Sequence, residues 1–109
     1  MILIVGGAFQ GKKEYAYEIC ENQEQVVFDA QDMILSWMKE GKDVYQEAEA
    51  FVKRHADGVI TLQEMGSGII PMDEFEREYR ELCGRIGCIW AKAATQVYRV
   101  VMGVSVRIK

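Results

Sequence analysis

The chain has 109 residues, enough for one domain spanning residues 1–109, and half of them are hydrophobic, so a modest core can form. Its 17 acidic and 13 basic residues leave a net charge of −4, which provides no global attraction for nucleic acid or a membrane surface. The longest apolar run, residues 1–5, is too short to span a bilayer and has no signal-peptide pattern, and the three cysteines lack metal-ligand spacing. We therefore expect a cytoplasmic protein with reduced thiols and with neither nucleic acid nor a membrane among its partners.

Short apolar runs alternate with amphipathic segments along the chain. From these patterns we expect, in order, a strand at 1–5, a helix at 12–22, a strand at 26–28, helices at 31–39 and 44–55, a strand at 58–62, a long helix at 73–94, and strands at 97–102 and 104–108. Strands that alternate with helices need parallel crossover connections, so the fold class is α/β, with three layers and a mostly parallel sheet. Only Gly103 separates the last two strands, which can form an antiparallel C-terminal edge.

The first strand runs directly into a glycine-rich turn, GGAFQGKK. Gly6, Gly11 and Lys12 match the first three fixed positions of the phosphate-binding pattern G-x-x-x-x-G-K-[ST]. Glycines let such a loop curl so that its N–H groups face phosphate oxygens, while the next helix points its positive end at the same place. A tight strand-to-helix turn without a ligand would need the same glycines.

The phosphate-binding interpretation predicts a P-loop NTPase-like domain with ATP or GTP as its ligand. The candidate cofactor-binding residues of this loop are Gly6, Gly7, Ala8, Phe9, Gln10, Gly11, Lys12 and Lys13. Lys12 is also a candidate catalytic residue, because its mobile ammonium can reach the terminal phosphates.

The fourth position of the pattern departs from the rule, because Lys13 stands where a Ser or Thr normally ligates Mg²⁺. An ammonium cannot ligate a metal, so the loop argues against a Mg²⁺ requirement. Asp29 follows the second strand and is a candidate metal ligand and catalytic residue, since a strand-terminal acid holds Mg²⁺ in P-loop proteins. Asp29 is also well placed to cap the helix at 31–39, which is a common function of Asp, and the two roles are compatible.

Residues 64–71, EMGSGIIP, resemble the E-x-G-x-G-[IV]-[IV]-P loop of the adenosylcobinamide kinase/adenosylcobinamide-phosphate guanylyltransferase family. The likeness continues in residues 77–85, which match the family's R-x-[FY]-R-x-x-x-G-R helix, and in residues 97–109, which are similar to its closing strands. The resemblance implies a nucleotide-dependent kinase acting on adenosylcobinamide, a corrinoid, with a homo-oligomeric assembly.

The resemblance also suggests roles for three further side chains. Glu64 follows an apolar strand at the edge of the sheet where ligands bind in open α/β folds, and it is the third candidate catalytic residue. Arg80 and Arg85 are candidate phosphate contacts, although ion pairs with the glutamates around them would explain both equally well.

The chain departs from this family in one functionally important segment. Family members carry a nucleophilic histidine between the first helix and the second strand, and this chain lacks that segment. His55, the only histidine, lies elsewhere and is expected to pack at a helix end. We therefore expect a retained kinase core without the guanylyltransferase histidine. The alternative is a catalytically inactive relic, or an oligomerising or regulatory phosphate-binding protein.

Overall fold

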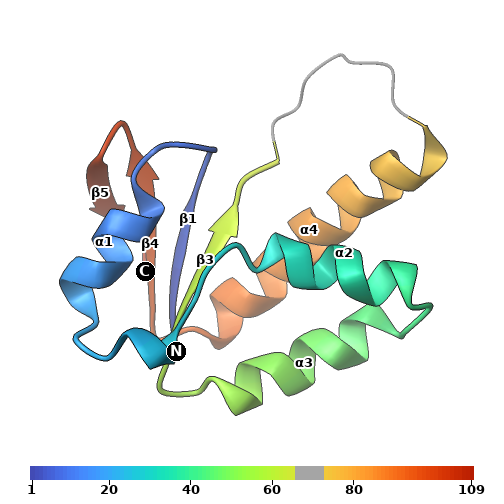
Figure 1. The fold of residues 1–109 in the computed structure, drawn as a ribbon, viewed down its shortest axis with the longest axis horizontal. Coiled ribbons are helices and arrows are strands. Elements are labelled where there is room, and N and C mark those ends of the chain that lie inside the picture. Colours follow the sequence, from blue (N-terminus) through green and yellow to red (C-terminus); the bar gives the residue numbers. More distant parts are fainter. Residues whose placement is uncertain (66–72) are drawn as a thin grey trace.

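The computed structural model describes residues 1–65 and 73–109, which form an α/β domain (Figure 1). The strands in this part of the chain are β1 (Ile2–Gly6), β2 (Val26–Val27), β3 (Val59–Gln63), β4 (Gln96–Val101) and β5 (Val104–Arg107). They form one sheet in the order β2-β3-β1-β4-β5, parallel throughout except for the antiparallel pair β4–β5. The predicted fold class, including the antiparallel edge, is confirmed.

Helices cover both faces of the sheet, which gives three layers (Figure 1). The helices are α1 (Lys12–Ile19), α2 (Gln31–Lys39), α3 (Val44–Arg54) and α4 (Glu74–Ala93). The chain crosses from β1 toward β2 through α1 and from β3 toward β4 through α4, in opposite directions along the sheet. Right-handed crossovers in opposite directions place α1 and α4 on opposite faces.

Two hydrophobic clusters occupy the spaces between these layers. The larger cluster lies between the sheet and α2, α3 and α4, and the smaller one lies under α1. The central strand β1 supplies both, because Leu3 belongs to the larger cluster and Ile4 to the smaller one, and each is fully buried. This two-sided burial explains why the strand is a continuous apolar run rather than an alternating one.

Trp90 of α4 anchors the larger cluster. Its ring is fully buried and stacks on Phe51 of α3 with 5.2 Å between ring centroids. Its indole N–H donates a hydrogen bond of 3.1 Å to the Ala48 carbonyl oxygen, so the one polar atom of the ring is satisfied. No helix in residues 1–65 and 73–109 has both the length and the apolar character needed to cross a membrane.

The helix predicted at 12–22 is shorter in the structure. It ends at Ile19, because Cys20 adopts an extended conformation. The chain then makes a short 3₁₀ turn, Gln23–Gln25, in which the Asn22 side chain accepts a hydrogen bond from the Glu24 N–H. Asn competes with helical hydrogen bonding in this way, which is the physical reason for the early stop.

The predicted cap of α2 by Asp29 is wrong. The N-cap residue is Ala30, and no side chain in the described part of the chain caps this helix. Asp29 instead adopts a left-handed backbone conformation with φ 55°, and its N–H donates to Thr61 Oγ1 at 2.8 Å. The turn therefore leaves the Asp29 carboxylate available to the edge of the sheet rather than to the helix.

Candidate functional site

The glycine loop between β1 and α1 is held by the turn of the β4–β5 hairpin. The Met102 N–H donates to Gln10 Oε1 at 2.6 Å, and the Gly103 N–H donates to the Gln10 carbonyl oxygen at 2.8 Å. Gly6 must lack a side chain, because a Cβ there would lie 2.6 Å from the Val100 carbonyl oxygen. The loop shape thus depends on residues from the two ends of the printed sequence.

Lys12 folds back under this loop and is only 7% exposed. Its ammonium donates a hydrogen bond of 2.5 Å to the Gly7 carbonyl oxygen. Burial lowers the pKa of Lys12, and the negative charges of Asp29 and Glu64 oppose that shift. Two of the predicted catalytic carboxylates therefore act electrostatically on the predicted phosphate-binding lysine.

A cavity of about 400 Å³ opens beside the loop at the N-terminus of α1; we call it the loop cavity. It is lined by Ala8, Phe9, Gln10, Gly11, Lys12, Lys13, Glu14, Phe28, Asp29, Gln31, Thr61 and Gln63. The first three residues of α1 are among them, and no side chain of the described residues caps the N–H groups of this helix end. Most of the predicted loop residues and Asp29 therefore share one cavity.

Several lining residues were not predicted. Phe28, Gln31, Thr61 and Gln63 reach the cavity from other elements, and Gln31 Oε1 accepts a hydrogen bond of 3.0 Å from the Gln63 N–H. Nothing in their local sequence marks them, since only the parallel pairing of β2 with β3 brings them together.

The loop cavity is a poor match for a resident metal ion. A Ser or Thr hydroxyl at position 13 would be needed to ligate Mg²⁺, but this position is occupied by Lys13. The Lys13 ammonium lies 5.5 Å from the centroid of the Phe28 ring. Asp29 and Glu14 are its two carboxylates, and no group of three or more His, Cys, Asp or Glu side chains among the described residues could hold a metal. The assignment of Asp29 as a metal ligand stays a prediction.

Glu64 is fixed at the base of the loop by an arginine that the sequence analysis missed. Its carboxylate accepts two hydrogen bonds from Arg99 of β4, at 2.9 and 3.1 Å, and its N–H donates to the Gly6 carbonyl oxygen at 2.8 Å. Arg99 lies in register with Val5 of β1. A charged residue inside a strand of otherwise uncharged, mostly apolar residues was the signal available in the sequence.

The two predicted phosphate-binding arginines lie apart from each other. Arg80 lines a second cavity next to Glu64, whereas Arg85 donates a hydrogen bond of 3.4 Å to the Tyr45 hydroxyl of α3. Within the described residues the structure does not bring Arg85 to the loop cavity, so its phosphate contact stays a prediction. Residues 66–72 of the glycine motif lie outside the described residues.

His55 packs at the end of α3, as expected. Its ring lies 4.5 Å from the Phe51 ring, and burial lowers its pKa. It precedes β3, at the opposite end of that strand from Glu64. It therefore lies at the edge of the sheet away from the glycine loop.

These features define an α/β domain of the P-loop-like class, in which a central parallel strand runs into a glycine loop with a buried lysine. The chain belongs to the cobinamide kinase/cobinamide phosphate guanyltransferase family, whose model matches residues 32–108. The match begins after the glycine loop, so the loop's assignment rests on its own pattern and geometry. The resemblance predicted from the sequence is thereby confirmed.

Two relatives show the same kinship. The chain is 39% identical over 51 residues to the bifunctional adenosylcobalamin biosynthesis protein CobU of Escherichia coli and, to the same extent, to that of Salmonella typhimurium. The matched segment is 47% of this chain and 28% of each relative.

Proposed function

We propose that the loop cavity binds the phosphates of ATP or GTP and that the chain acts as a kinase-like member of its family. One observation carries the proposal: the buried Lys12 lines a cavity at the N-terminus of α1, and no described side chain caps that helix end. A buried ammonium is costly unless an anion accompanies it. A bound phosphate would offset that cost and would accept hydrogen bonds from the helix N–H groups.

Lys13 gives this site an unusual relation to Mg²⁺. Its positive charge lines the cavity and attracts phosphate directly, while like charge repels a metal cation at the same place. Triphosphate therefore binds nearly as well without Mg²⁺ as with it. The lysine cannot reproduce the metal's geometric role in phosphoryl transfer, so transfer to an acceptor is slow.

The acceptor is proposed from the description of the family, which names cobinamide, and from the sequence resemblance. A chain that retains the kinase-like core would phosphorylate an adenosylcobinamide-type corrinoid, with Asp29 lining the loop cavity and Glu64 acting electrostatically on Lys12. Transfer of GMP through a histidine is not part of the proposal, because His55 lies at the other edge of the sheet. The second candidate, a phosphate-binding relic without catalysis, is favoured by one observation, the lysine at position 13.

Calorimetric titration with ATP and GTP tests the proposal. Lys12→Met removes the ammonium but keeps the length of the side chain, and we expect at least tenfold weaker binding, about 1.4 kcal/mol. Lys53→Met, at an exposed position on α3, is the matched control and should bind like the wild type. Equal affinities for Lys12→Met and the wild type would refute the assignment.

Repeating the titration with and without Mg²⁺ tests the role of Lys13. Lys13→Ser restores the hydroxyl of the phosphate-binding pattern and should make binding depend on Mg²⁺. Strong Mg²⁺ dependence in the wild type would contradict the charge-replacement argument. Intact-mass measurement after incubation with GTP should show no covalent GMP on the protein.

A further inference from the structure

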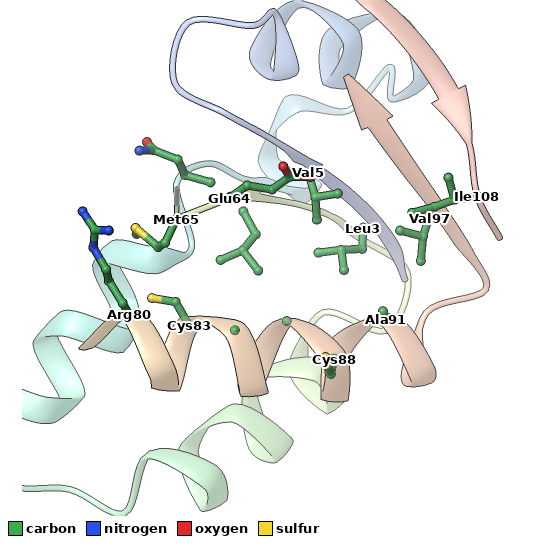
Figure 2. Close-up of a pocket in the computed structure, with 14 residues that line it drawn as sticks. Leu3, Val5, Glu64, Met65, Arg80, Cys83, Cys88, Ala91, Val97 and Ile108 are labelled. Atoms are coloured by element: carbon green, nitrogen blue, oxygen red, sulfur yellow. The ribbon is translucent and has the colours of Figure 1, made fainter. Parts of the chain in front are cut away.

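A second cavity lies on the opposite face of the sheet from α1, between α4 and strands β1, β3 and β4; we call it the α4 cavity (Figure 2). Its volume is about 350 Å³. Its aliphatic lining consists of Leu3, Val5, Leu62, Ala91, Val97 and Ile108. The proposed nucleotide site makes no use of this space.

Two glycines of α4 leave this space open. A Cβ on Gly84 would meet no described atom within 4 Å, and a Cβ on Gly87 would lie 3.2 Å from Leu62 Cδ2. Both residues line the cavity, so the helix presents bare backbone to the sheet at these positions. Glycine inside a helix is destabilising relative to alanine, and here it keeps the cavity from being filled.

The two ends of the α4 cavity differ in polarity. Arg80, Glu64 and Met65 lie toward one end, and Ala91, Val97 and Ile108 lie toward the other (Figure 2). The Glu64 carboxylate is already compensated by its two hydrogen bonds from Arg99. The guanidinium of Arg80 is a second positively charged group at this end and lines the cavity directly.

We propose that the α4 cavity binds a small amphipathic anion. Its apolar body lies between α4 and β1, and its carboxylate, sulfonate or phosphate head lies at Arg80, which suits bidentate recognition of such groups. Gln63 lines both the α4 cavity and the loop cavity, so the head of the ligand adjoins the triphosphate site. The proposal does not depend on nucleotide binding, because none of the loop residues lines the α4 cavity.

Two fluorescent naphthalene dyes test the apolar body and the anionic head separately. 1-Anilinonaphthalene-8-sulfonate (ANS) carries a sulfonate, and N-phenyl-1-naphthylamine is its neutral counterpart. Arg80→Gln should weaken ANS binding at least about threefold and leave the neutral dye within about twofold. Gly84→Leu places a side chain in the cavity and should weaken both dyes at least about tenfold.

Three controls separate the α4 cavity from other dye sites. Gly84→Ala leaves most of the space and should keep most of the ANS affinity. Val106→Thr alters the exposed apolar edge of β5, where Val106 is 54% exposed, and should leave binding unchanged. Lys12→Met should bind ANS like the wild type, so a failure of the nucleotide proposal would not be mistaken for a failure of this one.

Thiol labelling locates the bound dye. Cys88 is exposed and lines the α4 cavity, whereas Cys83 is buried with its pKa raised to about 11 and should react slowly. In a Cys20→Ser background, saturating ANS should slow the labelling of Cys88 several-fold. Unchanged labelling, or full ANS binding by Gly84→Leu with native circular dichroism, would overturn the proposal.

Discussion

The loop cavity and the α4 cavity share strand β3 and its residue Gln63, yet their chemistry is opposite. Side chains alternate along a strand, so Thr61 of β3 belongs to the loop cavity while its neighbour Leu62 belongs to the α4 cavity. The loop cavity adds lysines, carboxylates and the start of a helix, whereas the α4 cavity adds aliphatic side chains and helix glycines. One sheet therefore has a charged cavity on one face and a largely apolar cavity on the other.

The largest expected effect is on the free energy of unfolding and comes from removing a buried ring of α4. Trp90→Ala deletes the fully buried ring that stacks on Phe51, and we expect the free energy of unfolding to fall by about 3–5 kcal/mol. Urea denaturation measures this change. Val26→Ala, in the smaller cluster under α1, should cost clearly less, and equal costs would show that the two layers contribute equally.

Two glycine substitutions should move stability in opposite directions. Gly6→Ala forces a Cβ against the Val100 carbonyl oxygen and should cost about 1–3 kcal/mol and weaken triphosphate binding. Gly84→Ala meets no described atom and should stabilise the protein by about 0.5–1 kcal/mol, because alanine favours the helix. Thermal unfolding and titration of both variants check the pair, and a destabilised Gly84→Ala would mean that the α4 cavity is more crowded than described.

The smallest effect concerns the pH dependence of stability, at a site away from both cavities. Burial and the nearby Arg54 lower the pKa of His55 in the folded state, so the unfolded chain binds more protons once the pH falls below about 6.5. The contribution of His55 to stability is therefore complete above that pH and declines below it. His55→Asn should flatten unfolding curves measured between about pH 7 and pH 5 without altering ATP binding, and an unchanged pH profile would contradict the assignment.

The sequence predicted the residues of the loop cavity better than the residues of the α4 cavity. The glycines and Lys12 of the loop have a fixed spacing that is itself typical of a tight strand-to-helix loop. Lys12 and its neighbours could therefore be selected as candidate site residues before the fold was known. Gly84 and Gly87 look like ordinary helix residues, and their meaning depends on Leu62, which comes from another element. Arg99 was missed for the same reason, since its contact with Glu64 joins residues 35 positions apart.

Element boundaries were predicted well where hydrophobic periodicity is strong, as in α2 and α4. They were less accurate where a polar side chain redirects the backbone. The Asn22 side chain forms a local turn, and the Thr61 hydroxyl of β3 accepts a hydrogen bond from the Asp29 N–H; the helix and cap patterns anticipated neither contact.

The hairpin contact with Gln10 also bears on the order in which the molecule can fold. Met102 and Gly103 hold a loop that is synthesised some 90 residues earlier, and the central strand β1 pairs with β4 across a similar separation. On the ribosome, β1 would emerge long before its partners, with both apolar faces exposed. The glycine loop would acquire its final shape only after the β4–β5 hairpin has left the exit tunnel. Chains interrupted before that point would contain all the residues of the loop but lack its support.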